Sequence, residues 1–173
     1  MNSNLKKIVL SAVFAALIIV TTAYVKIPIG INEGYIHLGD SIIYLAGCLL
    51  GPFAAIAAAI GGAIADILAG AAMWAPGTAV IKALISVPFI IATAFYTKKN
   101  VSNRIIHLST ILVTLLSGAI TVFGYWLYEG FLYSFASAFA SMPFNVIQAV
   151  GSAVVFIILG CALGAVKIHK LLK

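Results

Sequence analysis

The sequence predicts an all-α membrane protein, folded as one compact bundle of six transmembrane helices. Of the 173 residues, 64% are hydrophobic and 8% are charged, against about 45–50% and about 25% in an ordinary soluble domain. So few polar side chains cannot cover the surface of a water-soluble fold. The apolar runs do not alternate as barrel strands do, so helices are the structure that satisfies every backbone group in lipid.

The chain is long enough for six transmembrane helices and little else. Each transmembrane helix takes about 20 residues, so six take roughly 120 and leave little room for a soluble domain. We therefore expect a single integral membrane domain over residues 1–173. The expected spans are about 8–25, 36–50, 53–70, 77–96, 105–128 and 141–166.

Local sequence signals mark where the apolar runs begin and end. The first run follows Lys6 and Lys7 and is too long for the apolar core of a signal peptide, so we expect it to be retained. A loop at 26–35 contains glycines and a proline. The second run is short enough to be tilted, and a Gly-Pro turn separates it from the third. Residues 129–140, before the sixth run, are expected to form a loop or a short interfacial helix.

The basic residues indicate how the bundle is oriented. With six spans both termini lie on one side, and eight of the ten basic residues fall there, which the positive-inside rule identifies as cytoplasmic. Because these residues sit at the ends of apolar runs, membrane orientation explains them better than a nucleic-acid partner. The eight are Lys6, Lys7, Lys98, Lys99, Arg104, Lys167, Lys170 and Lys173.

The acidic residues occupy the opposite end of the predicted bundle. Glu33, Asp40, Asp66 and Glu129 all fall near its outer mouth, and Lys82 lies inside the fourth span. An ionisable group within a span costs about 2.5 to 3.5 kcal/mol, so it faces a partner or a cavity. Two interpretations stay open for Asp66 and Lys82: they pair and hold two helices together, or they line an outward-facing polar pocket.

Helical spacing gathers further polar side chains at this depth. His37, Asp40 and Tyr44 share one helix face by i, i+3 and i+7 spacing. Convergent donors, acceptors and aromatic faces suit a planar, polar small molecule. An interfacial aromatic belt and interhelical hydrogen bonds are the alternative explanations. The candidate binding residues are His37, Asp40, Tyr44, Asp66, Trp74, Thr78, Lys82, Tyr125, Trp126, Glu129, Asn145 and Gln148.

Motifs for catalysis and cofactors are missing from the sequence. There is no phosphate-binding Gly-x-x-x-x-Gly-Lys loop, so active transport would draw energy from a partner or an ion gradient. The three histidines are far apart, and Cys48 and Cys161 have no metal-ligand spacing. We therefore expect no enzyme activity, no metal and no cofactor. Small residues on the first helix, Ala12, Ala15 and Ala16, are the best candidate surface for another membrane protein.

Several stretches, taken in order, resemble one known family. They are Gly34–Asp40 (GYIHLGD), Leu50–Pro52 (LGP), Gly61–Asp66 (GGAIAD), Trp74–Thr78 (WAPGT) followed by Lys82, and Pro143–Gln148 (PFNVIQ). The chain resembles the substrate-binding S components of energy-coupling factor (ECF) transporters, the vitamin importers of the bacterial cell membrane. The resemblance implies a vitamin site near the extracellular side, covered by the loop after the first helix. It also implies a first-helix surface, here Ala12 to Ala16, that contacts a transmembrane T component driven by two cytosolic ATPases.

The resemblance leaves the substrate open. The chain is most similar to the branch of riboflavin, pantothenate, pyridoxine and hydroxymethylpyrimidine carriers, and it departs from the riboflavin pattern between Trp74 and Lys82. We expect pyridoxine or hydroxymethylpyrimidine; pantothenate, with its carboxylate on Lys82, and riboflavin are the alternatives. From another class, a structural membrane protein without a ligand also fits. A channel does not, because the inner halves of the spans are apolar.

Overall fold

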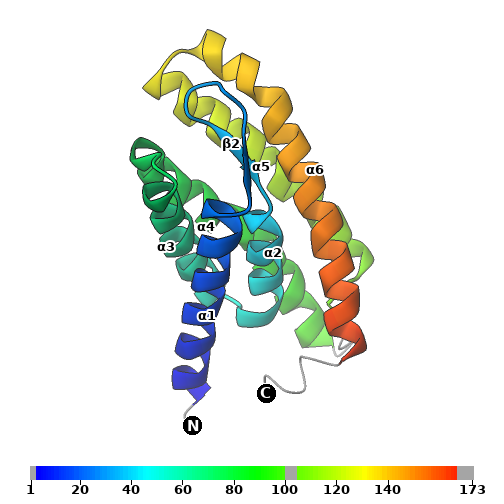
Figure 1. Ribbon diagram of the computed structural model, residues 1–173. Helices are drawn as coiled ribbons and strands as arrows, with labels where there is room; N and C mark the ends of the chain where they lie inside the picture. The colour runs from blue at the N-terminus through cyan, green and yellow to red at the C-terminus, as the bar shows by residue number, and fades with distance from the viewer. Residues whose placement is uncertain (1–2, 100–104, 167–173) are drawn as a thin grey trace.

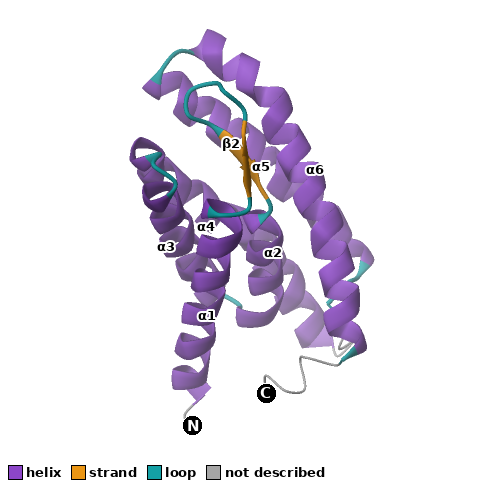
Figure 2. Cartoon of the chain, in the orientation of Figure 1, coloured by secondary structure: helices purple, strands orange, loops and turns teal. Residues whose placement is uncertain are grey.

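The computed structural model describes residues 3–99 and 105–166, and over these the chain is almost entirely helical (Figures 1 and 2). This confirms the all-helical prediction. A short 3-10 turn, η1 (Ala72–Trp74), precedes the fourth helix. The helices are α1 (Ser3–Ala23), α2 (Gly39–Leu50), α3 (Phe53–Leu68), α4 (Ala75–Lys99), α5 (Leu108–Leu132) and α6 (Phe135–Ala165).

Four of these helices are long and apolar enough to cross a membrane: α1, α4, α5 and α6. By contrast, α2 has 12 residues and α3 has 16, fewer than the roughly 20 that a full span takes. Six complete spans therefore remain a prediction. The start of α1 and the end of α6 lie at the same end of the bundle (Figure 1), and the cytoplasmic position of that end remains a prediction. Of the basic residues behind that prediction, Arg104, Lys167, Lys170 and Lys173 lie outside the described residues.

The segment between α1 and α2 is a β-hairpin, which the sequence did not predict. Strands β1 (Lys26–Pro28) and β2 (Tyr35–His37) pair antiparallel, with Lys26 opposite His37. Residues Asn32 and Glu33, in the turn, have φ values of 50° and 57°, a left-handed conformation that few side chains adopt. The hairpin, residues 26–37, reaches toward α5 and α6 (Figure 2) and is called the lid below.

Residues 129–140, expected as a loop or a short interfacial helix, belong instead mostly to the two long helices. Helix α5 continues to Leu132 and α6 begins at Phe135, which leaves a two-residue connection. The side chain of Ser134 accepts a hydrogen bond from the Ser137 backbone N–H at 3.2 Å. This serine N-cap satisfies one of the free amides of the first turn, so α6 starts earlier than hydropathy alone indicated.

Small residues let α3 pack closely between α1 and α4. A Cβ atom added at Gly62 would lie 2.8 Å from Lys82 Cγ and 3.0 Å from Thr78 Cγ2. A Cβ at Gly61 would lie 3.0 Å from the Ala15 carbonyl oxygen. Since real Cβ atoms are hardly ever so close, the two glycines fix the spacing of three helices and bring α4 against α3.

The core is centred on α2, which contacts α1, α3, α4 and α6. Tyr44 stacks on Phe89 with ring centroids 4.5 Å apart, and Phe156 meets Phe89 edge-on at 5.0 Å. All three side chains are fully buried. This aromatic cluster holds the first turn of α2 in the middle of the bundle, directly after the lid.

Candidate functional site

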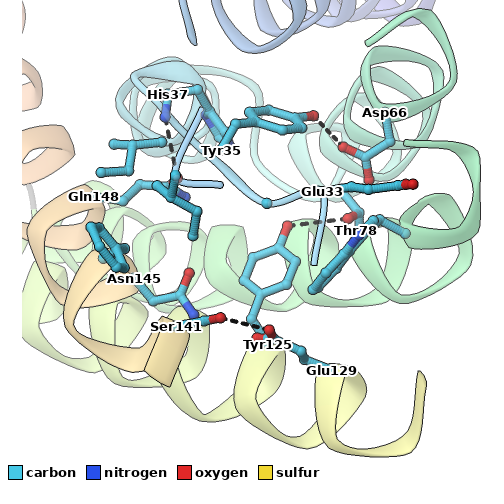
Figure 3. A pocket seen from close by; sticks show the side chains of 15 residues that line it. Glu33, Tyr35, His37, Asp66, Thr78, Tyr125, Glu129, Ser141, Asn145 and Gln148 are labelled. Carbon is cyan, nitrogen blue, oxygen red and sulfur yellow. Dashed lines mark hydrogen bonds between the residues drawn. The ribbon is translucent and has the colours of Figure 1, made fainter. Parts of the chain in front are cut away.

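A pocket lies under the lid, between it and helices α3, α4, α5 and α6 (Figure 3). Its volume is about 520 Å³, including the part open to solvent. The lid supplies Ile29, Glu33, Gly34, Tyr35, Ile36 and His37. The rest of the lining is Asp66, Trp74, Thr78, Tyr125, Glu129, Ser141, Phe144, Asn145 and Gln148.

Most of the candidate binding residues line this pocket, although their contact with a ligand stays a prediction. Eight do so: His37, Asp66, Trp74, Thr78, Tyr125, Glu129, Asn145 and Gln148. The other four, Asp40, Tyr44, Lys82 and Trp126, are not among the lining residues.

Asp66, near the end of α3, has one satisfied and one unsatisfied oxygen. Its side chain is 4% exposed, and Tyr35 Oη donates a hydrogen bond to Oδ1 at 2.5 Å (Figure 3). Oδ2 is buried and accepts no hydrogen bond of normal length within the described part of the chain, although the Thr78 hydroxyl acts on the carboxylate from somewhat farther away. Leaving a buried acceptor unpaired costs about 1–3 kcal/mol, and more for a charged group. Asp66 is therefore the pocket's clearest vacant acceptor.

An aromatic wall stands beside Asp66. Trp74 and Tyr125 have ring centroids 6.0 Å apart, and both side chains are at least nine-tenths buried. The hydroxyls of Tyr125 and Thr78 form a hydrogen bond of 3.2 Å (Figure 3). The wall thus combines flat apolar faces with hydroxyl groups, which suits a planar ring that carries polar substituents.

The tip of the lid is fastened to α5 and α6. The Asn32 side-chain amide donates to Glu129 Oε1 and to Ser137 Oγ. Glu129 Oε1 also accepts from Ser141 Oγ at 2.6 Å, and the Glu129 side chain is 1% exposed. The Trp74 indole N–H donates to the Asn32 carbonyl at 3.2 Å. These bonds hold the lid over the pocket and engage the Glu129 carboxylate.

A second polar cluster extends from the pocket lining at His37 and Gln148 to Asp40 and Lys82 behind it, and it ties the base of the lid to the bundle. Lys82 Nζ donates to Asp40 Oδ1 at 2.6 Å, and Gln148 Nε2 donates to Asp40 Oδ2 at 3.0 Å. Gln148 Oε1 in turn accepts from the His37 backbone N–H at 3.2 Å. One interpretation of the sequence is an ion pair between Lys82 and Asp66. The structure corrects the partner, because Lys82 pairs with Asp40.

Two lid residues, which lie outside the spanning helices, have shifted protonation equilibria. Burial, followed by the nearby Lys82 ammonium, lowers the pKa of His37 from 6.5 to about 3, against the opposing pull of Asp40. Burial and then the Asp66 carboxylate raise the pKa of Tyr35 well above its usual range. At neutral pH His37 is thus uncharged, and Tyr35 is the donor in its bond to Asp66.

Helix geometry explains why Tyr44 and Trp126 are not in the lining. Tyr44 lies four residues, about 6 Å of helix rise, beyond Asp40, and this places it in the core against Phe89. Successive helical residues point about 100° apart, so Trp126 turns away when Tyr125 faces the pocket. Trp126 packs instead near Phe135, with ring centroids 5.3 Å apart.

Sequence reasoning identified His37 but missed Tyr35 of the lid and Ser141 of α6. Tyr35 alternates with His37 on a strand, but a three-residue strand gives no recognisable pattern. Ser141 could have been found, because Ser141, Asn145 and Gln148 follow i, i+4 and i+7 spacing on one face.

An all-helical chain with several membrane-length apolar helices, folded around a covered polar pocket, is typical of a membrane protein that binds a small solute. The chain belongs to the family described as ECF-type riboflavin transporter, S component, which it matches over residues 2–165. It is also 34% identical over 146 residues to an uncharacterized protein in a gap 3′ region from Pyrococcus woesei, covering 84% of this chain and 90% of that protein. The family confirms the resemblance found in the sequence. It makes the chain a multi-pass membrane subunit of a transporter class, not of an enzyme class.

Proposed function

We propose that this protein is the high-affinity substrate-binding subunit of an ECF-type vitamin transporter. The observation that carries the proposal is the pocket under the lid, which joins an aromatic wall at Trp74 and Tyr125 to polar groups from four helices. A water-soluble vitamin is captured there from the extracellular side of a bacterial cell membrane. The chain itself does no chemistry on it.

For the substrate, we propose a small heteroaromatic vitamin or precursor, pyridoxine or hydroxymethylpyrimidine. Thr78, Asn145 and Gln148 offer hydrogen bonds around the aromatic wall, as a ring with hydroxyl or amino substituents requires. Riboflavin is the second candidate, favoured by the description of the matched family.

Uptake would depend on partner subunits. The family supports a transmembrane T component and two cytosolic ATPases, and the sequence has no nucleotide-binding loop of its own. Ala12 and Ala16 lie exposed on α1 beside the exposed side chains of Val9, Val13 and Leu17. Ala15 is partly covered, because its backbone packs against α3. We propose this α1 face as the contact for the T component.

The test is ligand binding by the purified protein in detergent. A panel of B vitamins is screened by thermal shift, and mass spectrometry identifies any vitamin that remains bound after purification. We expect one vitamin to bind with a Kd below about 1 µM, more than about 8 kcal/mol of binding free energy. At 100 times Kd it should stabilise the fold by about 2.7 kcal/mol. If no vitamin stabilises or accompanies the protein, the structural alternative without a ligand replaces this proposal.

A further inference from the structure

The charged side chains that line the pocket are all acidic. Three of the fifteen lining residues are carboxylates, Glu33, Asp66 and Glu129, and none is a lysine or an arginine. The remaining ionisable candidate for a cation, His37, is neutral because burial holds its pKa near 3. The pocket therefore presents acceptors and negative charge to whatever enters it.

The lysines that act on this region at longer range are already engaged. Lys82 is fully buried in its ion pair with Asp40 and is not part of the lining. Lys26 donates to the Ala69 carbonyl at 3.0 Å and lies over the Tyr35 ring. Neither ammonium group belongs to the lining, so a carboxylate or phosphate on a ligand would lie in a low-dielectric space whose lining carries like charges.

The three carboxylates differ in how many hydrogen-bond acceptors they leave available to a ligand. Glu129 is held by Asn32 and Ser141, and Glu33 is exposed on the lid. Asp66 is buried, and its Oδ2 accepts no hydrogen bond of normal length from the described residues; the neighbouring Thr78 hydroxyl is itself bonded to Tyr125. In Figure 3 its side chain extends from α3 toward the lid residues that cover the pocket.

We infer that Asp66 determines specificity in this pocket: its Oδ2 accepts a hydrogen bond from an N–H, O–H or ammonium group of the ligand, so the site takes neutral or cationic heteroaromatic vitamins and rejects their carboxylated and phosphorylated forms. The inference rests on the proposed function and narrows its substrate class. It disfavours pantothenate, which carries a carboxylate. It also assigns Asp66, not Lys82, as the charged group that the ligand meets.

The test measures Kd by calorimetry at pH 7 for matched ligands. One series varies a single position of the pyridine ring: pyridoxamine (aminomethyl), pyridoxine (hydroxymethyl) and 4-pyridoxate (carboxylate). Hydroxymethylpyrimidine and riboflavin are each compared with their monophosphates. For whichever series binds to the wild-type protein, we expect the anionic member to bind at least about tenfold more weakly than its neutral counterpart. An anion bound as tightly as its neutral counterpart overturns the inference, whatever any variant does.

The Asp66→Asn variant separates charge from size. It should weaken binding of the neutral or cationic ligand by about tenfold, and the ratio of Kd values between the anion and that ligand should fall by about the same factor. Discrimination that is unchanged in a folded Asp66→Asn protein reflects size alone and overturns the role of Asp66. Tyr24→Phe, at a 73% exposed side chain outside the pocket, is the preparation control. Failure of every vitamin to bind overturns the proposed function itself, a result distinct from binding without charge discrimination.

Discussion

Lys82 Nζ lies 2.6 Å from Asp40 Oδ1, and neither side chain has any solvent exposure. The pair joins α4 to the first turn of α2, and Gln148 connects it to α6. A charge pair placed here braces the bundle at the base of the lid. Its effect on ligand binding is then indirect, through the position of His37 and Gln148.

Removing one partner of this pair should destabilise the fold. Lys82→Met leaves the Asp40 carboxylate buried without its cation, and we expect the free energy of unfolding to fall by about 3–5 kcal/mol. Thermal unfolding in detergent measures it. The double variant Lys82→Met, Asp40→Asn should recover part of the loss, because it no longer buries a lone charge. A Lys82→Met protein of unchanged stability that has lost binding would instead make Lys82 a direct ligand contact.

Releasing the lid tip should speed ligand dissociation. Asn32→Gly removes the amide that bonds Glu129 and Ser137 while tolerating the positive φ of this position. Since a hydrogen bond to a charged group contributes about 1.5–3 kcal/mol, we expect dissociation to accelerate by at least tenfold, with faster amide exchange over residues 29–34. Ser137→Ala, which removes one of the two partners, should have a smaller effect. Equal dissociation rates in all three proteins would count against lid fastening.

The close approach of α3 and α4 predicts a contrast between two glycines. Gly62→Ala pushes a methyl group against Lys82 Cγ and Thr78 Cγ2, and overpacking of this kind costs about 1–3 kcal/mol. Gly164→Ala, on α6 with nothing within 4 Å, should be neutral or stabilise by up to about 1 kcal/mol, since alanine favours helix. Chemical unfolding of both variants measures the difference. Similar stabilities would show that α3 and α4 can separate without cost.

Neutral His37 predicts a pH-dependent stability. Below pH 6.5 the unfolded chain protonates this histidine, whereas the folded chain does so only near pH 3. The stability that His37 contributes is therefore complete above pH 6.5 and lost as the pH falls toward 3, by up to about 1.4 kcal/mol per pH unit. The His37→Asn variant should show a shallower decline over this range in thermal unfolding. A decline as steep as that of the wild type would assign the titration to other groups.

The fold was largely predictable from the sequence because lipid leaves few choices for an apolar backbone. The expected third span began at residue 53, where α3 begins, since a Gly-Pro turn marks that boundary locally. The lid strands were not predictable: each has three residues, and their pairing depends on contacts with α5 and α6 made through Asn32. The early start of α6 depends instead on a local feature, the Ser134 N-cap, which hydropathy alone does not indicate.

Within the candidate site, spacing along one helix identified shared faces but not depth. His37 and Asp40 fall on one predicted face, yet α2 begins only at Gly39, so His37 belongs to the lid and lines the pocket. Asp40, in the first turn of the helix, turns toward Lys82 instead. Which of two neighbouring polar groups meets the pocket is decided by where the helix begins and by its partners on other helices.

The bond from the Trp74 indole to the Asn32 carbonyl gives the lid an internal optical reporter. The chain has two tryptophans, and the second, Trp126, packs near Phe135 and Phe139 away from the pocket lining. With Trp126 replaced by phenylalanine, all indole emission would come from the ring that touches the lid tip. Opening of the lid would then be followed in real time by fluorescence, with no dye attached to the protein.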